Sequence, residues 1–389
     1  MIKRKASKKL DLLAKEYGVV SVTGPRQSGK TTLVKKHFPN HQYYNFEYLS
    51  DFEKIKADPV SFINGVSEGV IIDEVQKFPD ILSYIQVAID EHFQPAKFII
   101  TGSQNLLLSD KVSQSLAGRV GILNLMPLST DELVASKNLP KSYQDLILKG
   151  FYPSIYDKKQ TPGIYCNNYL NTYVERDVRS IKNIGDLSAF TKFLQLLAGR
   201  IGQILNLSEL GGVVGANHKT IDSWLSVLEA SYLVFKLEPY FNNYGKRLIK
   251  SPKVYFTDVG LASHLLRLDT ASEVNNYHGL GSLFENMVVA DIKKQIFNTL
   301  SSNKLYFFRD NKGLEIDLIL DSGNEIIPIE IKSSATFSSD YLDNIHKFKE
   351  ISGSNTGCLI YSGKGGDTVS DIRIFNYKDE FDINLLRNK

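Results

Sequence analysis

The chain has 389 residues, of which 42% are hydrophobic and 23% are charged, and its formal net charge is +3. This composition excludes a disordered, collagen-like or disulfide-rich secreted protein, and the length predicts about two or three domains. The two cysteines, Cys166 and Cys358, lie far apart without metal-ligand spacing, so we expect neither a disulfide framework nor a zinc site. Because no signal-peptide core and no run of about eighteen apolar residues occurs, we expect a cytoplasmic protein without a membrane contact.

The first predicted strand, GVVSVT, is followed at once by the glycine-rich sequence GPRQSGKTT. Its spacing fills each fixed position of G-x-x-x-x-G-K-[ST], a loop whose backbone N–H groups surround nucleotide phosphates. In that loop the lysine reaches the β- and γ-phosphates, the first threonine binds Mg²⁺, and the next helix adds its positive end. The sequence therefore predicts a nucleoside triphosphate site formed by Gly24, Pro25, Arg26, Gln27, Ser28, Gly29, Lys30, Thr31 and Thr32.

Two carboxylates follow a second apolar strand in the stretch GVIIDEVQKFP. Ligands bind at the carboxyl ends of strands in parallel sheets, so Asp73 is expected to hold Mg²⁺ and Glu74 to activate the attacking water. The alternative is a pair of solvated turn carboxylates. A further strand, FIITGSQ, ends in Ser103 and Gln104, which we expect beside the γ-phosphate as polar sensors.

Arg119 precedes the strand VGILNL and is expected to face away from its own nucleotide site. In a homo-oligomer it would reach the γ-phosphate of a neighbouring subunit as an arginine finger. The alternative is an ordinary surface arginine. Throughout this part of the chain short apolar strands alternate with helical patterns, which predicts an α/β fold with a parallel sheet covered on both faces.

The motifs GPRQSGKTT, VIIDEVQKFP, FIITGSQ and LAGRV together resemble the AAA-type P-loop ATPases of bacteria and archaea that carry a C-terminal domain of unknown function. The later segments KGFYPSIY, YLNTYVERDV, FTDVGLA and GSLFENMVV extend the resemblance over nearly the whole chain. It implies an ATPase that uses ATP and Mg²⁺, with an ATPase domain over residues 1–140. The roles that it carries over fall on Lys30, Thr31, Asp73, Glu74 and Arg119.

A helical and winged-helix domain is predicted over residues 141–270. The stretch LSELGGVVGANHKTIDSWLSVLEASYLVFKLEPY indicates a short helix, a turn at Gly215, a second helix and a β-rich wing. In DNA-binding proteins of this type the start of the second helix enters the major groove, and wing cations contact phosphates. The corresponding residues are Asn217, His218, Lys219 and Asp222 in the helix, and Lys246, Arg247 and Lys250 in the wing. A winged helix used only for packing is the alternative.

The third predicted domain, residues 271–389, resembles the PD-(D/E)xK nuclease core. Glu285 lies on the apolar stripe of a helix, Asp317 on a strand GLEIDLIL, and Glu330 and Lys332 on one face of IIPIEIKSS. The resemblance implies that the three carboxylates bind Mg²⁺ or Mn²⁺ and that Lys332 positions the attacking water. Simple ion pairs on exposed strand faces are the alternative.

Two functional interpretations follow. The first is a Mg²⁺-dependent ATPase that acts on or with DNA as an oligomer, with metal-dependent nuclease activity left open. The second is a nucleotide-controlled switch whose output is a protein contact and whose nuclease-like domain is catalytically inactive.

Overall fold

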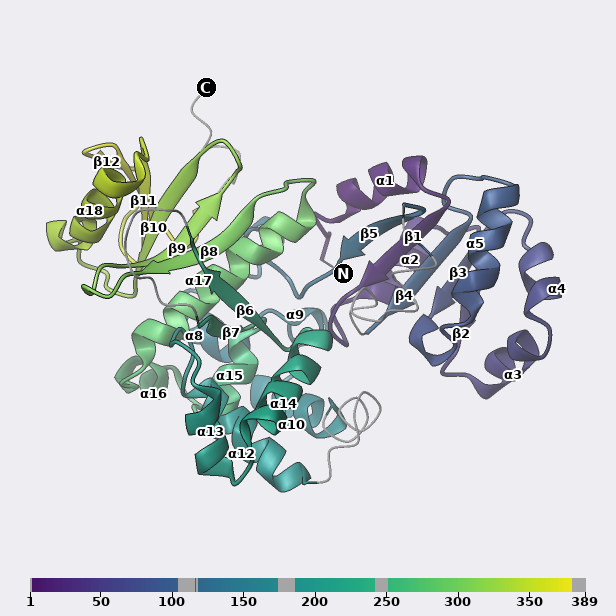
Figure 1. The fold of residues 1–389 in the computed structure, drawn as a ribbon, viewed down its shortest axis with the longest axis horizontal. Helices are drawn as coiled ribbons and strands as arrows, with labels where there is room; N and C mark the ends of the chain where they lie inside the picture. Colours follow the sequence, from purple (N-terminus) through teal and green to yellow (C-terminus); the bar gives the residue numbers. More distant parts are fainter. Residues whose placement is uncertain (1, 104–115, 117, 174–185, 242–250, 380–389) are drawn as a thin grey trace.

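The computed structural model describes residues 2–103, 116, 118–173, 186–241 and 251–379. They form two bodies that lie side by side, each built around its own sheet (Figure 1). No helix in these ranges is both long and apolar enough to cross a membrane.

The first body contains a five-stranded, all-parallel sheet of order β2-β3-β4-β1-β5. The strands are β1 (Val19–Thr23), β2 (Gln42–Asn45), β3 (Val70–Asp73), β4 (Phe98–Gly102) and β5 (Val120–Asn124). The helices are α1 (Ser7–Glu16), α2 (Lys30–His37), α3 (Leu49–Ala57), α4 (Pro59–Asn64) and α5 (Ile81–Glu91), with a short 3-10 turn η1 (Val75–Lys77).

Alternate residues of these strands enter two separate hydrophobic cores, one on each face of the sheet. Val20, Val22 and Ile99 pack with apolar residues of α1 and α2, whereas Val19 and Ile100 pack with those of α4 and α5. The predicted α/β fold with a parallel sheet covered on both faces is confirmed.

The second body contains an eight-stranded mixed sheet of order β12-β13-β11-β10-β9-β8-β6-β7. Its strands are β6 (Val234–Pro239), β7 (Lys253–Phe256), β8 (Lys304–Arg309), β9 (Glu315–Asp321), β10 (Ile326–Lys332), β11 (Gly357–Tyr361), β12 (Thr368–Val369) and β13 (Ile372–Asn376). The antiparallel hairpin of β6 and β7 joins the rest where Glu238 and Pro239 pair in parallel with Tyr306 and Phe307. One sheet therefore crosses residue 270, the predicted boundary between the second and third domains.

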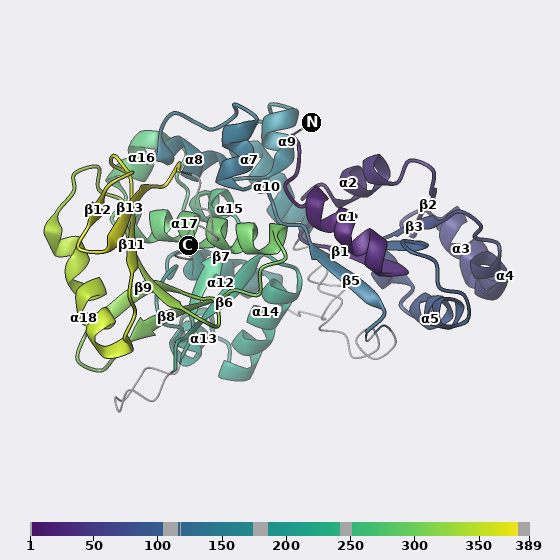
Figure 2. The same cartoon turned by 90° about the horizontal axis from the view of Figure 1, so that it is seen from above.

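The described helices of the second body lie on both faces of its sheet, most of them around α17, and α18 against β9, β10 and β11 on the other face (Figure 2). They are α7 (Thr130–Ala135), α8 (Tyr143–Lys149), α9 (Pro153–Asp157), α10 (Pro162–Tyr173), α12 (Leu187–Ala198), α13 (Leu207–Val214), α14 (His218–Ala230), α15 (Val259–Leu265), α16 (Ala271–Asn276), α17 (Leu280–Asn298) and α18 (Asp343–Ser352), with a 3-10 turn η4 (Ser339–Leu342).

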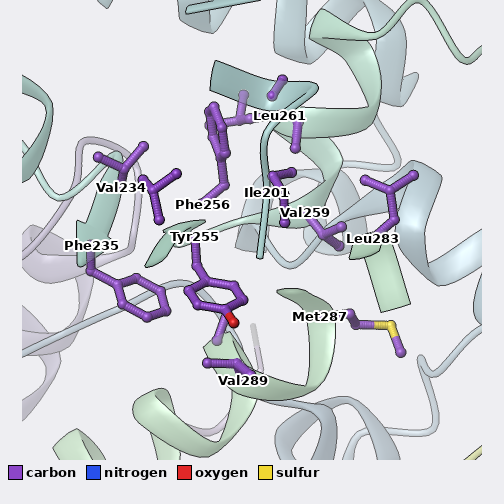
Figure 3. Packing of buried hydrophobic residues seen from close by; sticks show 14 of the residues in the cluster. Ile201, Val234, Phe235, Tyr255, Phe256, Val259, Leu261, Leu283, Met287 and Val289 are labelled. Carbon is purple, nitrogen blue, oxygen red and sulfur yellow. The ribbon is translucent and has the colours of Figure 1, made fainter. Parts of the chain in front are cut away.

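The largest hydrophobic core of this body joins the hairpin of β6 and β7 to α17, and two smaller clusters lie under α18. Figure 3 shows Phe235 and Tyr255 of the hairpin packed beside Met287 and Val289 of α17, and the rings of Phe235 and Tyr255 stack with centroids 5.6 Å apart. Leu128, near the end of the predicted ATPase domain, enters the same core. The division at residues 140 and 270 stays a prediction, and the core joins the second and third of those ranges closely.

Candidate functional site

The predicted phosphate loop lies between β1 and α2, at the carboxyl edge of the first sheet. Two of its positions require glycine. Gly24 has φ +149° and a Cβ there would lie 2.1 Å from the Leu125 carbonyl oxygen, while Gly29, which precedes α2, has φ +97°. Since side chains are excluded at both positions, the backbone N–H groups of the loop are open to an anion.

Lys30 and Ser28 supply polar groups inside this loop. The Lys30 ammonium donates to the carbonyl oxygens of Gly24 and Pro25, both at 2.9 Å, so it lies over the loop where phosphates would enter. The Ser28 side chain is fully buried, and its hydroxyl has no hydrogen-bond partner among the described residues. A buried polar group without a partner is costly, and a bound phosphate would remove that cost. These residues fit a nucleotide.

The buried Asp73 carboxylate lies next to the first turn of α2. The Thr31 hydroxyl donates to Asp73 Oδ2 at 2.7 Å, the Tyr43 hydroxyl donates to the same oxygen at 2.7 Å, and the Thr101 hydroxyl donates to Oδ1. Strands β2, β3 and β4 thus orient one carboxylate toward the loop. A hydroxyl and a carboxylate oxygen side by side are the ligands that Mg²⁺ takes at nucleotide sites, so these two residues fit the ion.

Glu74 follows Asp73 in a left-handed conformation, with φ +58°, at the point where β3 ends and η1 begins. The Gln76 amide donates to Glu74 Oε2 and, at 3.1 Å, to the Ser103 hydroxyl, and that hydroxyl lies 3.4 Å from the same oxygen. Burial raises the pKa of Glu74, and the nearby Lys30 charge opposes that rise. A carboxyl with a raised pKa is a stronger base when ionised. Gln104, the other predicted sensor, lies outside the described residues.

Arg4 connects the phosphate loop to other parts of the chain through hydrogen bonds. Its buried guanidinium donates to the carbonyl oxygens of Ser28 at 2.7 Å and Met126 at 2.6 Å, and to Glu132 Oε1 at 3.1 Å. Glu132 also accepts the Lys5 N–H at 2.7 Å, and its side chain is 0% exposed. Because Glu132 belongs to α7, a buried ion pair connects the phosphate loop to the second body.

A cavity of about 470 Å³ opens beside this contact. It is bordered by the N-terminal segment, the loop and α2, through Ile2, Arg4, Gly29, Thr32 and His37. Thr32, the last residue of the predicted loop, therefore faces this cavity.

Tyr232 brings the second body to the end of β1. Its hydroxyl lies 2.9 Å from the Thr23 hydroxyl and donates to Asn124 Oδ1 at 3.1 Å. Thr23 directly precedes Gly24, and Tyr232 connects α14 to β6. The turn between helix and hairpin is thus hydrogen-bonded to the start of the phosphate loop.

Arg26 and Arg119, the two predicted arginines of the nucleotide site, lie apart. The Arg26 guanidinium is 3.8 Å from Glu47. Arg119 precedes β5, at the amino edge of the sheet, and its Nε lies 2.5 Å from Asp90 Oδ1. A strand of five residues spans roughly 17 Å, so Arg119 is remote from its own phosphate loop.

In the last region α17, β9 and β10 bring the four predicted residues to one place. The Ile331 N–H donates to Asp317 Oδ2 at 2.9 Å, and the Lys332 ammonium lies 2.6 Å from Glu330 Oε1. Burial raises the pKa of both Glu285 and Glu330, and the charge of Asp317 adds to each rise. Glu330 Oε2 is buried and has no hydrogen-bond partner within the described part of the chain.

Two further side chains, those of Lys253 and Tyr255, contact the carboxylates of the predicted metal site. Lys253 Nζ lies 3.5 Å from Glu285 and 2.7 Å from Glu315, and the Tyr255 hydroxyl donates to Glu285 at 2.5 Å. Over the described ranges, no three His, Cys, Asp or Glu side chains are gathered so that they could hold a metal ion. As arranged, these carboxylates do not fit a divalent cation.

In the middle region α12, α13 and α14 precede the hairpin of β6 and β7, the element order expected of a winged helix. Asn217 caps α14 by accepting the Thr220 N–H at 2.9 Å, and Gly215 makes the turn with φ +75°. His218, Lys219 and Asp222 are exposed at the start of α14. The predicted wing cations Lys246, Arg247 and Lys250 lie outside the described residues.

Sequence reasoning missed several residues of these sites. Thr101 stands at the end of a strand already singled out, so strand-end polarity identifies it. Arg4, Tyr232 and Lys253 carry no local signal, because each acts on a group more than twenty residues away in the chain.

Three family models match successive parts of the chain. An AAA domain matches residues 16–134, a domain of unknown function (DUF8612) matches 140–272, and another (DUF4143) matches 280–379.

Among curated proteins, an uncharacterized protein of Mycobacterium tuberculosis is 29% identical over 337 residues, which cover 86% of this chain and 74% of that protein. An uncharacterized protein of Haemophilus influenzae is 26% identical and covers 85% of this chain and 86% of its own. Among solved structures, the Walker-type ATPase of Pyrococcus abyssi aligns with 68% of this chain and 96% of its own, at 15% identity and a TM-score of 0.46.

The match over residues 16–134 covers the part of the chain that contains the phosphate loop and the five-stranded parallel sheet. The first body of this chain is a P-loop ATPase domain of the AAA type.

Proposed function

We propose that the chain is a Mg²⁺-dependent ATPase that acts on or with DNA. The observation that supports this most directly is the grouping of Lys30, Thr31, Asp73 and Glu74 at one sheet edge. Lys30 exchanges its two loop carbonyls for nucleotide phosphates, and Thr31 and Asp73 hold the ion. Mg²⁺ supplies charge neutralisation on the phosphate oxygens.

Glu74 accepts the proton of the water that attacks the γ-phosphate. Ser103 and Gln76 hold its carboxylate in place by the hydrogen bonds described above. The cavity beside Thr32 is of suitable size for the nucleoside. In a homo-oligomer Arg119 completes the site of a neighbouring subunit, because at the amino edge of its sheet it is remote from its own loop.

The DNA role rests on the exposed start of α14. His218 and Lys219 are exposed in the first turn of a helix of thirteen residues that Asn217 caps, and this is the end that enters the major groove in helix-turn-helix proteins. With one cation among them, most affinity for DNA would come from phosphate contacts elsewhere. Binding should therefore weaken steeply as salt rises.

Cleavage by the last region is a separate proposal. It requires Asp317, Glu330 and Glu285 to share Mg²⁺ or Mn²⁺ while Lys332 positions water, which the arrangement described above does not favour. The contacts of Arg4 with the loop and of Tyr232 with Thr23, directly before it, favour the second candidate function, a nucleotide-controlled switch with an inactive nuclease-like region.

Electrophoretic mobility shifts distinguish the two candidates. Duplex, single-stranded and branched DNA are titrated with the full chain at low salt, with and without ATP, and with Lys219→Ala as the matched variant. DNA binding that ATP alters and Lys219→Ala weakens supports the ATPase acting on DNA. No retardation of any DNA form contradicts it and leaves the switch.

A further inference from the structure

Lys253 is a buried lysine whose partners belong to α17 and β9, elements that come later in the chain. It begins β7, its side chain is 2% exposed, and its ammonium lies 2.7 Å from Glu315 Oε1 and 3.5 Å from Glu285 Oε1. The same ammonium is 5.3 Å from the centre of the Phe307 ring. A buried ammonium is stable only when it is paired in this way.

Glu285 is enclosed by the same segment. The Tyr255 hydroxyl, two residues along β7, donates to its Oε1 at 2.5 Å. On another side a Cβ at Gly202 would lie 3.2 Å from both carboxylate oxygens, and the Gly202 N–H donates to the Val254 carbonyl at 3.1 Å. The carboxylate of α17 is therefore surrounded by residues that precede the last region.

The neighbouring carboxylates also have protein donors. Asp317 accepts the Ile331 N–H, Glu330 is paired with Lys332, and the Arg309 guanidinium lies 3.4 Å from Glu315 Oε2. A divalent ion needs several of these oxygens at once, at about 2.0–2.6 Å. Glu330 Oε2 is buried and has no hydrogen-bond partner among the described residues.

We propose that Lys253 is the resident cation of the carboxylate cluster formed by Glu285, Glu315, Asp317 and Glu330. Its ammonium takes the place that a divalent ion would take, and its ion pairs connect the hairpin of β6 and β7 to α17 and β9. A metal-dependent reaction in the last region would require this lysine to leave. The inference depends on neither ATP hydrolysis nor DNA binding, so it can fail independently of both.

The test uses the full chain without nucleotide, in an Asp73→Asn background that removes the magnesium ligand of the phosphate loop. Bound Mn²⁺ is counted by equilibrium dialysis, and the unfolding temperature is followed by circular dichroism with and without Mn²⁺. The variants are Lys253→Met, the conservative Lys253→Arg, and Lys332→Met, the same change at a half-exposed lysine of the cluster.

The Asp73→Asn chain should bind the same amount of Mn²⁺ as a chain that carries Asp317→Asn in addition. Lys253→Met should unfold several degrees lower than Lys332→Met, because it leaves the Glu285 carboxylate without its cation and Glu315 with Arg309 alone. Lys253→Arg should keep most of the stability. Mn²⁺ should raise the unfolding temperature of Lys253→Met alone.

Two results would overturn the proposal. One is that the Asp73→Asn chain binds Mn²⁺ and that adding Asp317→Asn abolishes this binding. This measurement does not depend on whether a Lys253 variant folds. The other is a Lys253→Met chain as stable as Lys332→Met, or one that Mn²⁺ does not stabilise.

Discussion

Replacing Arg4 by alanine should lower both the stability of the chain and its affinity for ATP. The change removes four hydrogen bonds and leaves the Glu132 side chain, which is 0% exposed, without its guanidinium. Breaking a buried ion pair costs about 3–5 kcal/mol. The lower end, about 3 kcal/mol, applies here because Glu132 keeps the N–H groups of Lys5 and Ser129.

The loss of ATP affinity follows from the Ser28 carbonyl, which no longer has its donor. A charge-assisted hydrogen bond contributes about 1.5–3 kcal/mol, and part of this energy holds the loop in the conformation that binds nucleotide. Without it, ATP affinity should fall about tenfold. Stability is measured by urea denaturation and affinity by titration with a fluorescent ATP analogue. Lys15→Ala, at an exposed lysine of α1, is the matched control.

A double-mutant cycle with Glu132→Gln decides whether the ion pair is the cause. Arg4→Ala should cost less in the Glu132→Gln background, because the amide has no charge left uncompensated. Equal stability of Arg4→Ala and Lys15→Ala, or a coupling energy of zero in the cycle, would refute the reasoning.

Three further outcomes are expected. Because burial raises the pKa of Glu74, the acid limb of the pH–rate profile of ATP hydrolysis should lie nearer neutrality than for an exposed glutamate; a limb at the ordinary glutamate pKa contradicts this. Tyr232→Phe removes two hydrogen bonds at the end of β1, so any effect of ATP on DNA mobility should shrink by up to about tenfold, and an unchanged ATP effect counts against a role in coupling. Arg119→Ala chains mixed with Lys30→Ala chains should regain part of the ATP turnover that each lacks, and mixed oligomers that remain inactive contradict an arginine finger.

The nucleotide site was predictable because its residues are close in sequence and have characteristic spacings. Gly24 and Gly29 are needed for backbone geometry, and Asp73 is positioned by the strand it ends, so a local pattern contains the information. Arg4 and Tyr232 complete the site through contacts between distant segments, which no local pattern records.

The carboxylate cluster shows where such a pattern falls short. The alternation in β9 and β10 correctly brings Asp317 and Glu330 near Glu285, but the pattern omits the other charges that enter the same space. Lys253 comes from a hairpin predicted to belong to a different domain, and its arrival changes the charge of the cluster. The pairing of β6 with β8 that allows this contact involves residues nearly seventy positions apart.

The central claim, ATP hydrolysis at the phosphate loop, is tested most directly by Glu74→Gln, which keeps the shape of the side chain and removes its base. ATP turnover and nucleotide binding are measured on the wild-type chain, Glu74→Gln and Lys30→Ala. Glu74→Gln should bind ATP as the wild type does and hydrolyse it at least about a hundredfold more slowly, whereas Lys30→Ala should not bind it. Wild-type turnover by Glu74→Gln, or an absence of ATP binding by the unmodified chain, would contradict the account.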